Sequence, residues 1–162
     1  MKNLFNLGLL LVISFTSTAF GDAQPTQTQQ LQLAQQQIYL LESALAPATS
    51  VGVVKLFAKA MQSRNGAVQY MLFCDTLQQQ YLSTFQQLNW VSGTSSPNIA
   101  SYTIQHGKKN KFTITYQMSL QNKSAGTMVD ELSVLPVKPT PYTTQNYCIA
   151  TYTRIPHLLG SN

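Results

Sequence analysis

The strongest constraint on the fold is a change in hydrophobic period near residue 90. Before this point apolar residues recur every three or four positions, which is the spacing of one face of an α-helix. Beyond it, in KFTITYQMSL at residues 111–120, apolar and polar residues alternate, as in a half-buried β-strand. Helices that precede strands joined by short turns predict an α+β fold with an antiparallel sheet.

The helical half opens with TQTQQLQLAQQQIYLLESAL at residues 26–45, a Gln-rich segment with apolar residues three and four positions apart. This spacing forms the a/d seam of two heptads and predicts an amphipathic helix within residues 24–46. Two heptads leave two interpretations open: the helix packs on its own domain, or it associates with a second copy. The seam consists of Leu31, Ala34, Ile38, Leu41 and Leu45.

Three further helices are expected before the change of period. Their ranges are 51–64, 67–73 and 75–88. Ser50 has the character of an N-cap for the first of them. Asp75, with Gln78 three residues later, forms the pattern of a capping box and predicts the N-cap of the last.

Four strands are expected after the change of period. Their ranges are 101–106, 111–120, 127–135 and 146–155. Short polar segments at 107–110 and 122–126 predict hairpin turns between the first three strands, whereas a Pro-rich segment leads to the last one. These connections indicate that neighbouring strands run antiparallel.

The N-terminus has the pattern of a secretory signal peptide over residues 1–21. Lys2 precedes an apolar run at residues 7–15, and small residues follow at Ala19 and Gly21. The run is too short to span a bilayer, and no later segment approaches a spanning length. We therefore expect an exported product, periplasmic or secreted, without a membrane span.

Charge is sparse, at 9% of residues, and the balance is mildly basic. Ten Lys and Arg residues stand against five Asp and Glu, and loss of Lys2 with the signal leaves nine against five, or +4. The only basic cluster is Lys108, Lys109 and Lys111. It suits contact with phosphate or an acidic partner, or simply a solvated hairpin tip. A nucleic-acid binder usually carries a denser basic stripe with aromatic residues, so none is expected.

Two cysteines, Cys74 and Cys148, fall in the helical half and in the last strand. A disulfide between them would contribute about 4 kcal/mol by restricting the unfolded chain. The alternative is two separate thiols that act as small buried hydrophobic groups. The sequence leaves both alternatives open.

A family resemblance rests on RNGAVQYML at 64–72, LNWVSGTSSPNIASYTI at 88–104 and IQHGKKNKFTITY at 104–116. Over residues 50–154 the chain resembles small exported bacterial domains of the nuclear transport factor 2-like, or cystatin-like cone, superfamily. The resemblance implies a domain at 50–155 in which helices pack on a curved antiparallel sheet, with the Gln-rich helix as an addition and a tail at 156–162. The superfamily includes enzymes and binding modules, so the fold does not fix the function.

The loop that carries the most specific part of this resemblance, Trp90 to Pro97, is predicted to be structural. Gly93 to Pro97 lacks the Lys of a phosphate-binding loop and precedes a strand where that motif requires a helix. Gly, Ser and Pro are instead typical of a turn. Trp90 is expected to anchor the core.

Titratable residues that could act in catalysis are few, and they show neither a metal-binding spacing nor a nucleophile–base pattern. The set comprises Glu42, Asp75, Asp130, Glu131, His106 and His157. Asp130 and Glu131 are neighbours in a strand, so they face opposite sides and cannot form a carboxylate pair. None of the carboxylates in the set is expected to lie among the aromatic residues of the cone. We therefore assign no catalytic residue, metal or cofactor.

The leading hypothesis is a non-enzymatic exported module that holds a small apolar ligand or binds a protein. An apolar, aromatic concavity would carry the ligand; its residues are Tyr70, Tyr81, Phe85, Tyr102, Phe112 and Tyr116. Filling of the cone by Phe112, Tyr116 and Met118 would favour protein contact instead. The alternatives are a hydrolase, isomerase or dehydratase of the cone fold, which requires an inward-facing acid or His, and a structural subunit of an envelope or secretion assembly.

Overall fold

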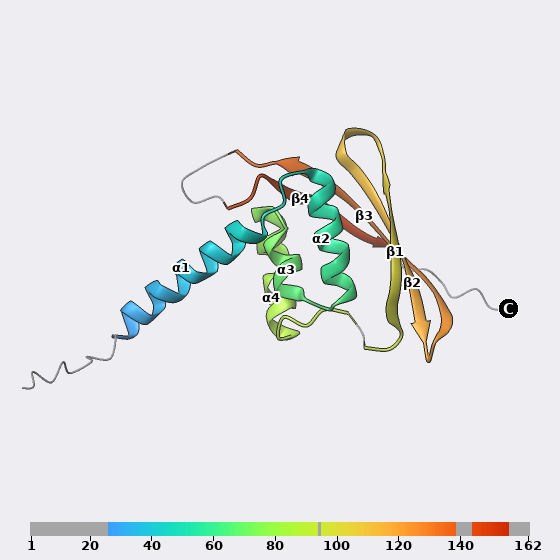
Figure 1. Ribbon diagram of the computed structural model, residues 1–162, viewed down its shortest axis with the longest axis horizontal. Coiled ribbons are helices and arrows are strands. Elements are labelled where there is room, and N and C mark those ends of the chain that lie inside the picture. The colour runs from blue at the N-terminus through green and yellow to red at the C-terminus, as the bar shows by residue number, and fades with distance from the viewer. Residues whose placement is uncertain (1–25, 94, 139–143, 156–162) are drawn as a thin grey trace, which may run out of the picture.

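The computed structural model describes residues 26–93, 95–138 and 144–155 (Figure 1). Over these residues helices precede strands, which confirms the α+β prediction. The elements are α1 (Gln27–Leu45), α2 (Ser50–Gln62), α3 (Gly66–Met71), α4 (Asp75–Gln87), β1 (Asn98–His106), the 3-10 turn η1 (Lys108–Asn110), β2 (Lys111–Leu120), β3 (Lys123–Pro136) and β4 (Tyr147–Ile155).

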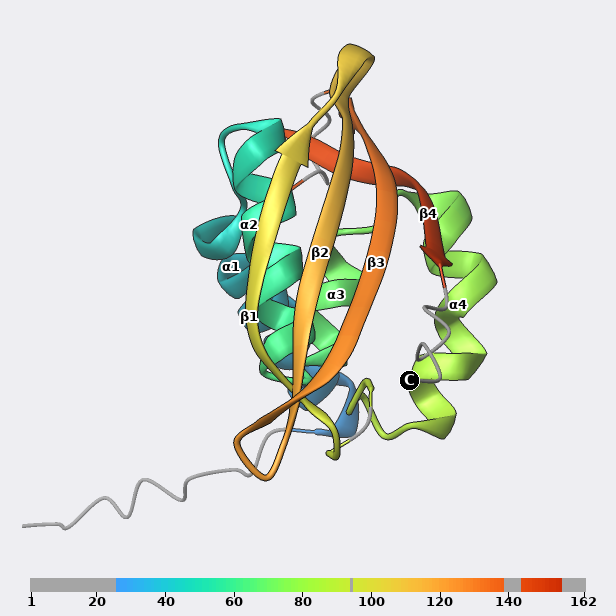
Figure 2. The same ribbon diagram turned by 90° about the vertical axis from the view of Figure 1, so that its right-hand side faces the viewer.

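The sheet is open, and its strands follow the chain in the order β1-β2-β3-β4, each antiparallel to the next. Figure 2 shows the sheet in front of the helices, with the β1–β2 hairpin at one end and the β2–β3 hairpin at the other. The register pairs Ile114 with Asp130 and Asp130 with Arg154, so these side chains share the helix-facing side. The expected strands are confirmed, with β1 and β3 starting a few residues earlier than predicted.

The core lies between the sheet and α2, α3 and α4. Phe57 of α2, Leu72 after α3 and Ile149 of β4 are fully buried. Phe112 and Tyr116 of β2 join them, at 2% and 0% exposed. At the level of these two residues, aromatic side chains fill the space between helices and sheet.

Two helix starts differ from the prediction by one residue. Thr49, not Ser50, is the N-cap of α2, and its hydroxyl accepts a hydrogen bond from the Gly52 N–H at 3.0 Å. Cys74 occupies the N-cap position of α4, and Asp75 is the first helical residue. The capping prediction for Asp75 is therefore wrong, although a carboxylate in the first turn still suits the positive end of the helix dipole.

Cys74 and Cys148 form a disulfide with a Cα–Cα distance of 5.0 Å. Two backbone hydrogen bonds join the same two segments. The Cys74 N–H donates to the Ile149 carbonyl at 2.9 Å, and the Ile149 N–H donates to the Leu72 carbonyl at 2.8 Å. The bond thus joins the α3–α4 junction to β4. It is compatible with an oxidising, exported environment.

The loop after α4 is a structural corner, as predicted. The Ser92 N–H donates to the Arg64 carbonyl at 3.1 Å, and the Arg64 Nε–H donates back to the Ser92 carbonyl at 3.3 Å. Gly66 is required here, because a Cβ at this position would lie 2.7 Å from the Trp90 carbonyl oxygen. Trp90 itself is 37% exposed and stacks on Phe85 with ring centroids 6.1 Å apart, so its prediction as a core anchor is wrong.

The first helix, α1, projects away from the rest of the molecule (Figure 1), and none of its residues is buried. It begins at a complete capping box. The Thr26 hydroxyl accepts from the Gln29 N–H at 3.3 Å, and the Gln29 side chain accepts from the Thr26 N–H at 2.8 Å. Among the described residues no single helix has the length and hydropathy of a membrane span; α1 and α2 reach them only as one segment, bent by 114°.

Candidate functional site

The most unusual surface of the protein is the apolar surface of α1. It consists of Leu31, Leu33, Ile38, Tyr39, Leu40, Leu41 and Leu45. Their side chains are exposed from 42% at Tyr39 to 63% at Leu41. Leu31, Ile38, Leu41 and Leu45 form one stripe along the helix, and an exposed apolar stripe of this kind marks an interaction surface in folded proteins. Leu33 and Leu40 lie on the opposite face. The predicted seam belongs to this surface, and its fifth member, Ala34, is exposed as well.

The charge on α1 is almost absent, because Glu42 is its only charged residue. Glu42 points to a cavity of about 560 Å³ beside the disulfide, which Asp75 and Tyr70 also line. Partial burial raises the pKa of Glu42, and a hydrogen bond with Thr144 opposes this shift. α1 itself therefore carries no positive charge.

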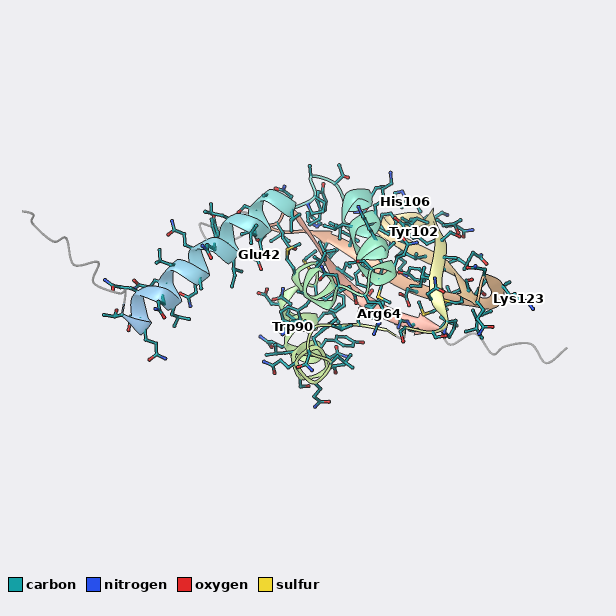
Figure 3. The ribbon with its side chains drawn as sticks, turned by 60° about the horizontal axis from the view of Figure 1, so that its bottom comes forward. Glu42, Arg64, Trp90, Tyr102, His106 and Lys123 are labelled. Atoms are coloured by element: carbon teal, nitrogen blue, oxygen red, sulfur yellow. A yellow bond between two sulfur atoms is a disulfide. The ribbon has the colours of Figure 1, made fainter. Side chains whose placement is uncertain are left out.

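The six aromatic residues predicted to line one concavity fall into separate groups. Tyr70 and Phe85 pack edge to face with centroids 5.8 Å apart, beside Trp90. Tyr102 lies over Tyr116 at 6.3 Å, on the opposite flank of the core. Figure 3 shows Trp90 and Tyr102 on different parts of the molecule.

The remaining members of the aromatic set are divided in the same way. Tyr81 approaches Tyr152 at 6.1 Å and, with Phe85, lines a small cavity of about 140 Å³. Phe112 and Tyr116 are core residues. The set therefore does not surround one open cone.

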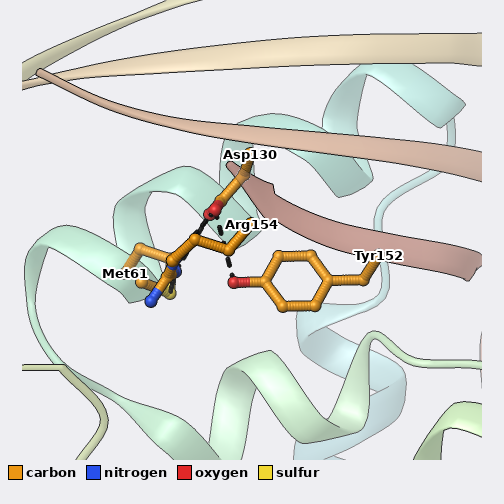
Figure 4. Close-up of polar contacts among 4 residues, drawn as sticks. All are labelled: Met61, Asp130, Tyr152 and Arg154. Atoms are coloured by element: carbon orange, nitrogen blue, oxygen red, sulfur yellow. Dashed lines mark hydrogen bonds and ion pairs between the residues drawn. The ribbon is translucent and has the colours of Figure 1, made fainter. Parts of the chain in front are cut away.

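An ion pair with a buried carboxylate lies at the inner face of the sheet, where the sequence pattern predicted no acid (Figure 4). Asp130 is 0% exposed and accepts two hydrogen bonds from Arg154, from Nε at 2.9 Å and from Nη2 at 3.1 Å. The Tyr152 hydroxyl donates to the same carboxylate at 3.4 Å, and Arg154 Nη2 lies 3.6 Å from the sulfur of Met61. The expectation that no carboxylate lies among the aromatic residues is wrong.

The phenols beside this ion pair resist ionisation. Burial, and then the negative charge of Asp130, raise the pKa values of Tyr116 and Tyr152. Burial alone would lower the pKa of Arg154, but its hydrogen bonds to Asp130 and the nearby phenols raise it. The Tyr116 hydroxyl is buried and has no hydrogen-bond partner among the described residues.

This arrangement favours structure over acid–base chemistry. Both carboxylate oxygens of Asp130 are engaged by a guanidinium that stays protonated, so the carboxylate is not free to take a proton from a ligand. The signal for the pair was present in the sequence. Alternation places Asp130 with Leu132 and Val134 on the buried face of β3, and Tyr152 with Arg154 on one face of β4.

The other predicted residues lie apart from this pair. Glu131 is exposed, as expected for the neighbour of a buried Asp130. His106 is exposed and stacks on Phe112 with centroids 4.4 Å apart. Over residues 26–93, 95–138 and 144–155, no group of three or more His, Cys, Asp or Glu side chains could hold a metal ion. His157 lies outside the described residues.

The lysine cluster is a solvent-facing hairpin tip. Lys108 and Lys109 lie in η1, Lys111 begins β2, and all three side chains are exposed. The cluster stands at the end of the sheet opposite the β2–β3 hairpin (Figure 2). It stays a candidate for contact with anions.

Comparisons of the chain with protein-family models, with curated proteins and with solved structures find no match. We therefore infer function from the geometry of the chain itself.

Proposed function

We propose that the protein is an exported, non-enzymatic interaction module that binds protein through α1. The observation that carries this proposal is the apolar surface of α1, seven large side chains exposed on a helix that buries none of its residues. Most helical stability in proteins comes from tertiary or quaternary packing of an apolar face, and α1 packs no such face within its own chain. The filled interior between helices and sheet supports protein contact over a ligand enclosed in a cone.

We assign the domain formed by α2 to β4 to the cone-shaped nuclear transport factor 2-like folds. Its three helices on one face of an open antiparallel sheet agree with that architecture. The signal-like N-terminus and the disulfide support export, to the periplasm or beyond. A subunit of an envelope or secretion assembly is one biological form of such a module.

The partner that best fits α1 is a second copy of the chain. The a/d seam is flanked at its e and g positions by Gln30, Gln35, Gln37, Glu42 and Ala44. Because only one of these side chains is charged, two copies can meet without like-charge repulsion along the seam. A two-fold interface uses the same patch on both copies, which suits one stripe on one helix.

The expected dimer is weak. Burying a half-exposed Leu or Ile completely is worth about 1 kcal/mol, so the four large seam residues of two copies contribute about 8 kcal/mol. Association costs at least about 4 kcal/mol, which leaves a dissociation constant on the order of 1 mM for the seam alone. Leu33 and Leu40 lie on the opposite face of α1 and do not add to this interface.

Sedimentation equilibrium of the mature protein, from about 10 µM to about 1 mM, tests this proposal. We expect a reversible monomer–dimer equilibrium that is lost when residues 24–47 are deleted. A mature chain that stays monomeric over the whole range, or a dimer that survives the deletion, would overturn it. Far-UV circular dichroism of the shortened chain checks that the domain remains folded.

A matched pair of variants separates the seam from general hydrophobicity. Ile38→Gln with Leu41→Gln removes two seam residues, whereas Leu33→Gln with Leu40→Gln removes two equally exposed leucines outside it. Glutamine is a good helix former, so both variants retain helix propensity. The seam variant should be monomeric and the control should still dimerise. Equal loss in both would indicate non-specific apolar contact.

An enzyme of the cone fold is the second candidate, because Asp130 is an acid that faces inward beside two tyrosines. Its bidentate bond to Arg154 weighs against a role as general base. Native mass spectrometry of the protein from its own compartment distinguishes the candidates. A dimer without added mass favours the module. A reproducible small-molecule adduct on a monomer points to a small-molecule site, and the identity of the adduct separates an enzyme from a binding module.

A further inference from the structure

A second candidate binding site is a cleft around Arg154, which lies apart from α1. Two cavities, of about 150 and 140 Å³, share Met61, Gly93 and Arg154 as lining residues. We call their union the Arg154 cleft. It lies where the C-terminal end of α2 meets the last residues of β4, at one border of the filled core.

One wall of the cleft is soft and apolar. In the larger cavity Met61, Met118 and Met128 gather with Ile99, from α2 and three different segments of the sheet face. Methionine side chains adapt readily to the shape of an apolar ligand. An apolar cavity of this volume accommodates a molecule about the size of benzene.

The other wall carries positive charge. Arg64 and Arg154 both line the larger cavity, and neither cavity has an acidic residue among its described lining residues. Arg154 is neutralised by Asp130 through Nε and Nη2, and Nη1 takes no part in these bonds. Arg64 donates from Nε to the Ser92 carbonyl and from Nη2 to the Gly93 carbonyl at 3.4 Å, which fixes its position without cancelling its charge.

We propose that the Arg154 cleft binds a small organic monoanion, a carboxylate with a short apolar chain. The carboxylate would meet Arg64 and the unused edge of Arg154, and the chain would lie against the three methionines. One uncompensated positive charge matches one negative charge, and guanidinium groups are well suited to carboxylates. This site goes beyond the proposed docking role of α1 and does not depend on it.

The methionines provide a direct test. Removal of the signal leaves four methionines in the mature chain, of which Met61, Met118 and Met128 line the cleft while Met71 is buried in the core away from it. The mature protein labelled with ¹³C at methionine methyl groups is titrated with hexanoate and, separately, with hexan-1-ol. We expect saturable shifts of the three cleft methyls with hexanoate, with a dissociation constant on the order of 0.1–1 mM, and no shift of Met71.

Hexan-1-ol and the Met71 methyl group are the two controls for specific binding of the carboxylate in the cleft. Hexan-1-ol should bind at least about tenfold more weakly, because it lacks the charge that Arg64 recognises. Equal binding of acid and alcohol, equal shifts at Met71, or no saturable shift at any cleft methyl would each overturn the proposal.

Two charge variants locate the anion. Arg64→Gln should weaken hexanoate binding at least about tenfold, and Arg64→Lys should retain part of it. Lys108→Gln makes the same change in net charge at the far hairpin and should leave binding unaltered. If Lys108→Gln weakens binding and Arg64→Gln does not, the anion binds at the lysine cluster and the assignment to the cleft is wrong. Arg154 is not substituted, because its removal would leave the buried Asp130 carboxylate without its ion-pair partner.

Discussion

Removal of the Cys74–Cys148 disulfide should lower the free energy of unfolding by about 4 kcal/mol. The two residues are 74 positions apart, and a cross-link over a loop of this length restricts the unfolded chain by about that amount. The perturbation is the double substitution Cys74→Ala with Cys148→Ala, which removes the cross-link and leaves no single thiol.

The folded state should change little in this variant. The backbone hydrogen bonds that join Cys74 and Leu72 to Ile149 do not involve the sulfur atoms, so they hold the α3–α4 junction against β4 without the disulfide. Cys148 is 9% exposed, and alanine fills most of its volume. The loss should therefore come mainly from the greater entropy of the unfolded chain. It corresponds to a fall in melting temperature of about 15 °C for a domain of this size.

Urea unfolding of the oxidised protein and the variant, followed by far-UV circular dichroism, measures the difference. Wild-type protein in reductant is the matched control and should unfold at the same urea concentration as the variant. A difference below about 1 kcal/mol would refute the loop-entropy reasoning. An unchanged circular dichroism spectrum before unfolding confirms that the variant starts from the same fold.

Three further predictions concern the buried ion pair and its phenols. Asp130→Asn should cost about 3 kcal/mol in unfolding experiments, the lower end for a broken buried pair because the Arg154 side chain is 37% exposed; Glu131→Gln, on the opposite face, should cost less than about 0.5 kcal/mol. Tyr116→Phe should leave stability unchanged or raise it by up to about 1 kcal/mol, since its hydroxyl is buried without a partner in the described chain, and a larger loss would reveal an unseen bond. Burial, and then the charge of Asp130, raise the pKa values of Tyr116 and Tyr152 in the folded protein. Tyrosines in the unfolded chain ionise near pH 10. The contribution of these two phenols to the free energy of unfolding should therefore be fully present below about pH 10 and fall as the pH rises above it. Phenolate absorbance at about pH 11 should count two more ionised tyrosines in denaturant than in the folded protein, and equal counts would contradict the assigned shifts.

Much of the fold could be predicted from local patterns. The alternation in residues 111–120 placed Phe112, Ile114 and Tyr116 on one face, and that face is the buried one. The exact residues at which helices begin could not be predicted from the sequence. Thr49 and Ser50 are both good caps, and only the backbone geometry decided that the Thr49 hydroxyl meets the Gly52 N–H.

The candidate sites were only partly predictable. The seam of α1 was evident from its heptad spacing, but nothing in the spacing shows that α1 stands away from its own domain. The Arg154 cleft was missed because it combines residues from α2, the corner after α4 and several strands. Trp90 was misplaced for a related reason: its hydrophobicity favours burial, but the corner that holds it leaves one side of the ring open.

By itself, the sequence determined which segments become helices and strands and which side of β2 and β3 faces inward. These properties depend on residues two to four positions apart, whose relative geometry the backbone fixes. Tertiary structure alone decided the pairing of Asp130 with Arg154, the bond between Cys74 and Cys148, and the exposure of α1. Each depends on how segments tens of residues apart lie against one another, and this is set by the packing of the whole core and the register of the sheet.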